Sequence, residues 1–92
     1  MIEVLFFSGS NCGVCHALEP KVRQLIKEKY DEYIDYEVTK VEVDQERAAQ
    51  HLVFTLPVLI VKKESREVKR FVRAFGVHQV DEFLARLISQ VV

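Results

Sequence analysis

The fold is decided by residues 4–16, Val4-Leu5-Phe6-Phe7-Ser8-Gly9-Ser10-Asn11-Cys12-Gly13-Val14-Cys15-His16. Four apolar residues followed by four small polar residues indicate a buried strand that runs directly into a loop. From the cysteines onward, apolar residues recur at helical spacing as far as Tyr30, which predicts a helix over residues 12–30. Pro20 should kink this helix without ending it, because the pattern continues on both sides. Two thiols therefore lie at the amino end of a helix that follows a strand.

The middle of the chain predicts a second strand and a short helix. Apolar and polar residues alternate over residues 34–43, which is typical of a half-buried strand. The alternation slips once near Thr39-Lys40, so we expect a bulge there. Asp44 can cap a short helix that continues to Leu52, because its carboxylate can accept a hydrogen bond from an amide of the first turn.

The last third of the chain predicts a hairpin and a long helix. Residues 58–61 form a continuous apolar strand, residues 62–67 a turn, and residues 68–75 the next strand. Val80 begins an apolar series at i, i+3, i+4, i+7, i+8 and i+11, which is a strong helical pattern. A strand-helix-strand unit pairs in parallel, whereas a tight hairpin pairs antiparallel. The predicted fold class is therefore α/β, with a four-stranded mixed sheet and helices on both faces.

Length and composition indicate one domain over residues 1–92, since 49% of the residues are apolar and 29% are charged. A net charge of −1 gives no reason to expect nucleic acid or a membrane as a partner. Glu3 stands where a signal peptide would carry positive charge, and no apolar run reaches the roughly 18 residues of a membrane span. We therefore expect a cytoplasmic protein and take it to be a monomer. In a reducing compartment, two cysteines indicate catalysis or metal binding rather than a structural disulfide.

Two cysteines separated by two residues at a helix start have the spacing of a redox pair. Unpaired N–H groups of the first turn and the helix dipole stabilise a thiolate on Cys12, which should lower its pKa from the free value of about 8.5. Cys12 can then attack a substrate disulfide as the nucleophile. Cys15, one turn further on, can displace the product as the resolving thiol and close a disulfide with Cys12.

The chain resembles the thioredoxin family along nearly its whole length. Cys12-Gly13-Val14-Cys15 is similar to that family's Cys-Gly-Pro-Cys site, and Pro20 stands where the family's helix-kinking proline does. Residues 40–45 resemble the end of the family's next strand, Leu56-Pro57 resembles its cis-proline step, and residues 80–84 resemble its final helix. The resemblance implies a thioredoxin-like fold and a thiol-disulfide oxidoreductase that needs no cofactor. Its partners would be protein disulfides and an unidentified reductase.

The resemblance also assigns residues to a substrate groove. Pro57 would be cis and would lie against the two thiols, which leaves the backbone of Leu56 free to pair with an extended substrate segment. A trans proline that simply opens the strand is the alternative. Arg73 falls where the family has a glycine beside this groove. A cation there could narrow the groove, favour acidic partners or stabilise the Cys12 thiolate.

Several positions depart from the family pattern. Asn11 replaces a tryptophan and Val14 replaces a proline, so the family's broad substrate surface does not follow from the resemblance. Phe6 occupies the place of a buried acid that assists proton transfer to the resolving thiol, so we expect no acid in that role. Lys40 matches the lysine that neighbours this acid, and His16 lies in the first helical turn. Both are candidates for modulating thiol pKa values, with a solvated surface role as the alternative.

Three other functions are compatible with the same cysteines. Residues 12–16 spell C-x-x-C-H, an attachment signature for c-type haem, but the missing export signal and the lack of a methionine beyond Met1 argue against it. Two thiolates with His16 or His51 could bind zinc or share a cluster between two chains. No second paired motif is present, so we expect no metal. A redox-silent module that binds peptides is the third function, although it would not need both cysteines.

Overall fold

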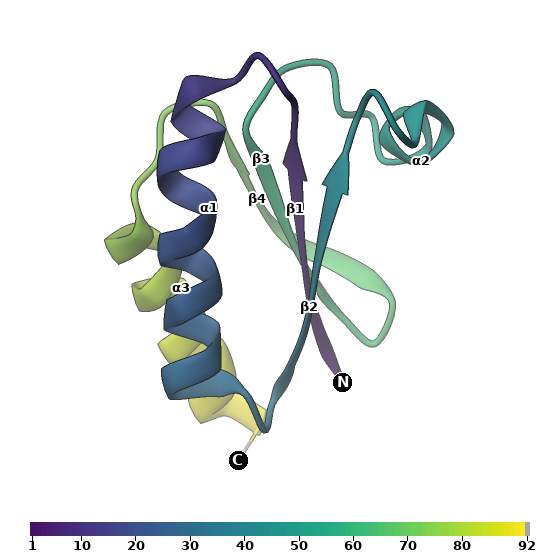
Figure 1. Cartoon of the computed structure of the whole chain (residues 1–92). Coiled ribbons are helices and arrows are strands. Elements are labelled where there is room, and N and C mark those ends of the chain that lie inside the picture. Colours follow the sequence, from purple (N-terminus) through teal and green to yellow (C-terminus); the bar gives the residue numbers. More distant parts are fainter. Residues whose placement is uncertain (92) are drawn as a thin grey trace.

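The computed structural model describes residues 1–91 of the chain (Figure 1). The strands are β1 (Ile2–Ser8), β2 (Ile34–Lys40), β3 (Val58–Lys63) and β4 (Arg66–Val72). The helices are α1 (Gly13–Leu25), which continues into the π-helical turn η1 (Ile26–Tyr30), α2 (Gln45–Gln50) and α3 (Val77–Val91). In the sheet, the strand order is β2-β1-β3-β4; β1 and β2 are parallel, and the other neighbouring strands are antiparallel. The expected four-stranded mixed sheet is confirmed.

β1 lies inside the sheet because its side chains are apolar on both faces. Val4 pairs with Tyr36 on β2 and with Val61 on β3, and Phe6 pairs with Val38 and Leu59. Both faces of such a strand are buried from solvent, as a continuous apolar run predicts. The loop that follows β1 therefore leaves from the middle of one sheet edge.

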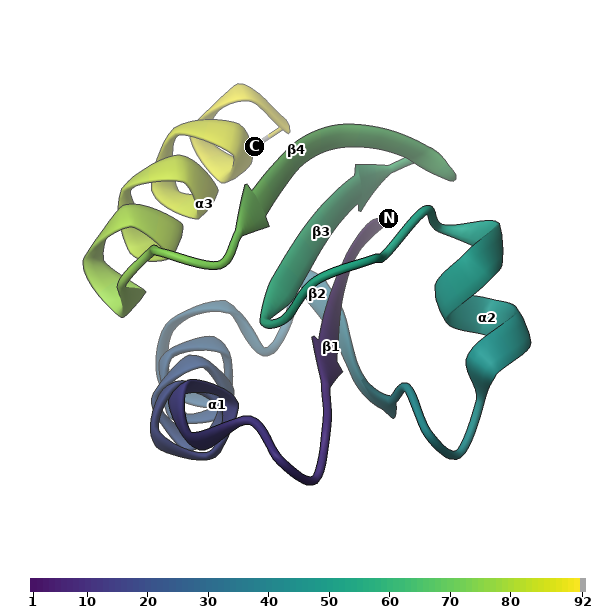
Figure 2. The same ribbon diagram turned by 90° about the horizontal axis from the view of Figure 1, so that it is seen from above.

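Helices cover both faces of the sheet, as the sequence predicts: α1 and α3 lie on one face and α2 on the other (Figure 2). Each face has its own apolar cluster, because successive residues of a strand point to opposite sides. The larger cluster, under α1 and α3, includes Ile2, Val4, Phe6, Cys15, Val22, Leu59, Val61, Val80 and Leu84. The smaller cluster, on the side of α2, includes Leu5, Phe7, Ala48, Val53, Val58 and Ile60.

The predicted second strand, residues 34–43, was too long. β2 ends at Lys40, and its pairing with β1 is regular as far as that residue, so the expected bulge near Thr39-Lys40 is wrong. Beyond Lys40 the chain turns, because the amides of Val43 and Asp44 both donate to the Lys40 carbonyl at 3.0 and 3.1 Å. The slip in the alternation therefore marks the end of the strand. Asp44 caps α2 as expected, accepting from the Arg47 amide at 3.0 Å.

The hairpin turn is tighter than predicted. Residues 62–63 and 66–67 belong to the strands, and only Glu64 and Ser65 form the turn. Both have positive φ (51° and 67°), which matches the right-handed twist of two antiparallel strands. At its other end β4 stops at Val72 instead of residue 75, because Arg73 has a φ of 63° and leaves the extended conformation.

The first helix follows the prediction apart from its first residue. Cys12 is the cap and Gly13 the first helical residue. The helix continues through Pro20, as the pattern on both sides of that proline indicates, and its last turn widens to a π-helix at η1. α1 therefore runs from the edge that carries the cysteines to the opposite edge of the sheet (Figure 1).

Candidate dithiol site

Cys12 is held at the amino end of α1 by hydrogen bonds to residues that precede and follow it in the chain. Its backbone is extended (φ −103°, ψ 95°), and its sulfur accepts a hydrogen bond from the Cys15 amide at 3.1 Å. The Cys12 amide donates to the Gly9 carbonyl, and the Cys12 carbonyl accepts from the His16 amide, both at 3.2 Å. The sulfur therefore lies where first-turn amides and the helix dipole favour a negative charge.

The two sulfurs form a disulfide but have different surroundings. The Cα atoms of Cys12 and Cys15 are 5.2 Å apart. Cys15 is fully buried in the larger apolar cluster, whereas Cys12 is partly exposed and lines a groove. A dissolved partner therefore meets Cys12 first, and Cys15 lies behind it.

The peptide bond between Leu56 and Pro57 is cis, so the expectation from the family resemblance is confirmed. Pro57 is fully buried just before β3. The loop before Cys12 packs closely against this step: a Cβ atom at Gly9 would lie 2.7 Å from Leu56 Cδ1. The Leu56 side chain would therefore have to shift to admit a larger residue at Gly9.

A groove of about 730 Å³ runs along the sheet edge that carries the disulfide. At this edge β1 and β2 end, β3 begins and β4 ends, because β3 runs antiparallel to its neighbours. Four connecting segments therefore meet there, as binding loops do on a rigid scaffold. The lining residues are Gly9 to Val14, Val41, Glu42, Phe54 to Pro57, Arg73 and Ala74.

The groove carries one acid and one base among the described residues that line it, Glu42 and Arg73. The Ser10 amide donates to Glu42 Oε2 at 2.8 Å, and this hydrogen bond holds the pKa of the Glu42 carboxyl below its usual value. The amide of Arg73 donates to the Pro57 carbonyl at 2.8 Å. This bond fixes Arg73 in a left-handed conformation that costs a residue with a side chain about 1–2 kcal/mol.

The structure brings together the residues that the sequence assigns to the thiols and the groove. Cys12, Leu56, Pro57 and Arg73 all line it, and Cys15 is joined to Cys12 by the disulfide. Their roles in catalysis and substrate binding stay predictions.

The two candidates for pKa modulation lie outside the groove lining. His16 is exposed on the first turn of α1, and its side chain forms no hydrogen bond with residues 1–91. Lys40 is exposed at the end of β2, where it borders a separate hollow with Arg23 and Arg47. Phe6 is fully buried in the cluster that contains Cys15, so an aromatic ring fills the position discussed above for a buried acid.

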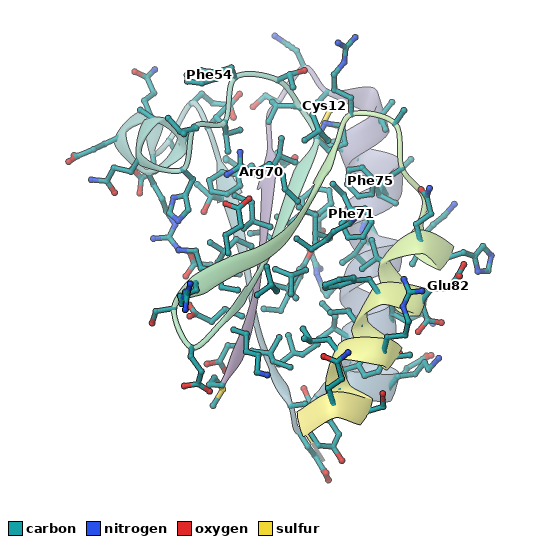
Figure 3. The ribbon with its side chains drawn as sticks, turned by 180° about the vertical axis from the view of Figure 1, so that it is seen from behind. Cys12, Phe54, Arg70, Phe71, Phe75 and Glu82 are labelled. Carbon is teal, nitrogen blue, oxygen red and sulfur yellow. A yellow bond between two sulfur atoms is a disulfide. The ribbon has the colours of Figure 1, made fainter. Side chains whose placement is uncertain are left out.

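Phe54 and Glu42 are groove residues that the sequence analysis missed. Phe54 is 83% exposed, although an aromatic side chain of this size usually packs into a core. It lies on the loop after α2, at the same edge of the molecule as Cys12 (Figure 3). Its sequence signal was an aromatic residue three positions before Pro57 that fits neither neighbouring pattern. Glu42 was hidden because residues 41–43 were assigned to a strand.

The described residues offer few further ligands for a metal. Within residues 1–91, no group of three or more His, Cys, Asp or Glu side chains is placed to hold an ion. His51 is used elsewhere: its Nδ1 lies 2.9 Å from the Arg47 carbonyl, and its Nε2 lies 3.0 Å from Lys62 Nζ. Across the same part of the chain, no helix has the length and apolar character required to cross a membrane.

A mixed sheet flanked by helices, a disulfide at the start of α1 and a cis-proline beside it define the class of thioredoxin-fold dithiol proteins. Sequence comparison makes the assignment more specific. The family model named Thioredoxin matches residues 2–86, and the chain belongs to the thioredoxin family.

Solved structures support the same assignment. Thioredoxin 1 from the thermophilic eubacterium Thermosipho africanus is similar, with a TM-score of 0.89, 34% identity and 97% coverage of both chains. Fasciola hepatica thioredoxin has a TM-score of 0.82 and 29% identity, over 92% of this chain and 79% of that one. The fold prediction is therefore confirmed at the level of the family.

Curated relatives are longer than this chain. Thioredoxin H7 of Arabidopsis thaliana is 36% identical over 77% of the chain and 54% of its own length, and Thioredoxin H8 is 35% identical over 91% and 53%. The chain thus spans about half the length of the curated relatives it matches.

Proposed function

We propose that the chain is a thiol-disulfide oxidoreductase that reduces disulfides of partner proteins through a Cys12/Cys15 dithiol-disulfide cycle. The observation that carries this proposal is the disulfide at the amino end of α1, with one sulfur in the groove beside the cis bond before Pro57. A structural role would gain little, because a bridge between residues three apart closes a very short loop.

In the first step, the Cys12 thiolate of the reduced protein attacks one sulfur of the substrate disulfide. The substrate S–S bond breaks, the distal substrate sulfur leaves with the electron pair and takes a proton, and a mixed disulfide with Cys12 forms. The groove admits a substrate to Cys12, and the amides of the first turn of α1 stabilise the attacking thiolate.

In the second step, Cys15 attacks the Cys12 sulfur of the mixed disulfide. The bond between Cys12 and the substrate breaks, the second substrate thiolate leaves, and the Cys12–Cys15 disulfide closes. The proton of Cys15 passes to the departing thiolate, and Phe6 fills the position discussed above for an acid that would assist this transfer. Two electrons have then moved from the protein to the substrate, and a separate reductase must return the pair to the dithiol.

The groove supports binding of an extended substrate segment. Leu56 makes no backbone hydrogen bond to any of the described residues, so its N–H and C=O are free to pair with a partner strand. Val14 and Phe54, 57% and 83% exposed, supply apolar surface beside the reacting sulfur. A partner would cover these side chains together with the disulfide.

The surroundings in which such a reductant works complete the proposal. A cytosolic thiol pool would keep the dithiol reduced, and in that compartment the protein would reduce its substrates. We therefore propose that it acts in the cytoplasm. We also expect it to act as a monomer. The zinc, haem and redox-silent alternatives use the same cysteines and become outcomes of the test below.

The decisive experiment measures the reduction potential of the Cys12/Cys15 pair and, in the same preparation, the catalysed reduction of a protein disulfide such as that of insulin. We expect a reversible two-electron couple, a loss of two titratable thiols on oxidation, and turnover with a chemical reductant. A pair that cycles without turnover on any protein disulfide would favour the redox-silent module. Stoichiometric zinc bound by the thiols, or haem absorbance, would contradict the proposed cycle.

A further inference from the structure

Arg73 occupies a backbone position that suits glycine. Its φ is 63°, in the left-handed region that side chains disfavour, and its amide is held there by the bond to the Pro57 carbonyl at 2.8 Å. Glycine would satisfy the same backbone bond without that cost. The side chain at this position is therefore not explained by the backbone geometry.

The guanidinium of Arg73 is available to a ligand. Arg73 is exposed, and its side chain forms no hydrogen bond or ion pair with the described residues. By contrast, Arg70 on β4, three residues before Arg73, is engaged within the protein: it binds both oxygens of Glu67 at 2.8 Å and the carbonyls of His51 and Leu52 at 2.7 and 3.2 Å (Figure 3). Arg73 lines the groove with five donors that the protein itself does not use.

The groove is electrically asymmetric. Glu42 follows the end of β2 and Arg73 follows the end of β4, at opposite margins of the sheet. Three strand spacings separate these margins, or about 14 Å. Glu42 is fixed by the Ser10 amide next to the thiol-bearing loop, so the acidic end of the groove is also oriented. A bound segment therefore meets a negative charge at one end and a positive charge at the other.

We infer that Arg73 is a specificity-determining residue that selects disulfide substrates carrying an aspartate or glutamate beside the reacting cysteine. This inference rests on the proposed function, because the carboxylate is recognised while the substrate sulfur lies against Cys12. The guanidinium pairs with the carboxylate in bidentate geometry, which a lysine could not reproduce. Glu42 disfavours a second acid at the opposite end of the segment.

A general effect on the thiolate would look different. If Arg73 acted only by stabilising the Cys12 thiolate, its removal would slow attack on every disulfide by the same factor. Recognition of a substrate carboxylate changes the ratio between substrates. That ratio should fall as salt rises, because exposed charge pairs are screened within about 10 Å at 0.1 M.

The test uses a set of short peptides, each with one cysteine in a mixed disulfide with 5-thio-2-nitrobenzoate. Attack by Cys12 on the peptide sulfur releases the coloured thiolate, so its absorbance gives the second-order rate constant. The peptides differ only in having Asp, Asn or Lys two residues from the cysteine, on either side. At low salt we expect the peptide with Asp on one side of the cysteine to react about 3- to 10-fold faster than its Lys counterpart. Attraction of the Asp peptide and repulsion of the Lys peptide by Arg73 each contribute a few-fold to this ratio.

Matched variants test whether Arg73 causes the difference in rate constant between the Asp and Lys peptides. Arg73→Gln and Arg73→Gly should abolish it, and Arg73→Glu should invert it. Arg66→Gln removes one positive charge from the far end of β4 and should leave it unchanged. Equal rates with all peptides, or a preference that survives in Arg73→Gln, would overturn the inference and leave the redox function standing. No reaction of the reduced protein with any peptide would instead overturn the redox function and the inference together.

Discussion

The two ends of α1 are built differently. At the amino end, Cys12 and Cys15 are joined to each other, and a groove opens over the exposed sulfur. Further along the helix, Glu19 is buried and receives hydrogen bonds from the Tyr36 hydroxyl at 2.8 Å and from the Arg23 side chain. This contact ties α1 to β2 through charged and polar groups.

The carboxyl end is tied in the same way to α3. In η1, the Tyr30 hydroxyl donates a hydrogen bond to the Asp81 carboxylate, and Lys29 Nζ lies 3.0 Å from both oxygens of the same carboxylate. These bonds hold the pKa of Asp81 below its usual value, mainly through the Tyr30 hydroxyl. Burial and the same carboxylate raise the pKa of Tyr30 to about 12.

One helix therefore carries out two tasks at separate places. Its middle and far end are fixed to the sheet and to α3 by buried or partly buried polar side chains, whereas its amino end presents the Cys12 sulfur to a groove. Substitution of the partly exposed Cys12 should therefore change chemistry and leave stability nearly unchanged, whereas substitution of Glu19 or Tyr30, whose side chains make these contacts, should do the reverse. Each prediction below tests one half of this contrast.

The largest effect is expected at the sulfurs. Cys12→Ser should lower disulfide-reductase turnover by more than about 100-fold, because no second thiol is among the described residues that line the groove. Cys15→Ser should also stop turnover but leave the first attack intact, so that mixed disulfides accumulate on Cys12. Mass spectrometry of each variant after incubation with cell extract distinguishes the two. Adducts on Cys15 in the Cys12→Ser protein would contradict the assigned roles.

The next effect concerns stability. Glu19→Ala should lower the free energy of unfolding by about 1–3 kcal/mol, since it leaves the partly buried Tyr36 hydroxyl without its acceptor. Urea unfolding at pH 7 measures the change. Glu28→Ala removes an exposed glutamate from η1 and serves as the control, with an expected change within about 0.5 kcal/mol. A large loss of turnover in Glu19→Ala, at a temperature where the protein stays folded, would contradict the view that Glu19 contributes to stability and not to catalysis.

A smaller effect is expected at the rim of the groove. Phe54→Ser should lower kcat/KM for a protein disulfide by about 3- to 10-fold, because a bound partner would no longer bury the ring. Val43→Ser is the matched control: Val43 is 80% exposed but does not line the groove. Equal losses in both variants would mean that Phe54 contributes no more than general surface hydrophobicity.

The smallest effect depends on pH. The native pKa of Tyr30 is raised from 10.0 to about 12, so the native state holds this proton more tightly than the unfolded state. Its contribution to stability is complete below pH 10 and is lost as the pH rises toward 12. Tyr30→Phe should cost about 1 kcal/mol at pH 7 and show a weaker alkaline decline than the unchanged protein. Urea unfolding at pH 7 and pH 11 tests this, and an equally steep decline in the variant would contradict it.

Local patterns determined most of the fold. The apolar runs of β1 and β3, the helical spacing in α1 and α3, and the cap at Asp44 each depend on neighbours in the chain, so the sequence predicted them. The cysteine pair was predicted for the same reason, because its spacing and its place after a strand are both local. The cis bond before Pro57 came from the family resemblance alone.

The errors concern places where the backbone leaves a regular element. β2 ends at Lys40 because its carbonyl accepts two amides of the following turn, and β4 ends at Val72 because Arg73 bonds to the Pro57 carbonyl. The latter contact joins residues far apart in the chain, so no local pattern reports it. Apolar side chains beyond such ends, Val43 among them, resemble strand residues in the sequence but are exposed in the fold.

The mixed sheet, its helices and the position of two thiols at a helix start followed from the sequence, because the hydrophobic period and capping act between near neighbours. The full set of residues that line the groove beside Cys12 depends on how distant segments come together. The ends of β1, β2 and β4 and the start of β3 meet at one edge of the sheet, which places Glu42 and Phe54 in the same groove as Cys12 and as Arg73, which the family resemblance had already assigned to it. Strand order and direction, rather than any local pattern, bring these distant residues together.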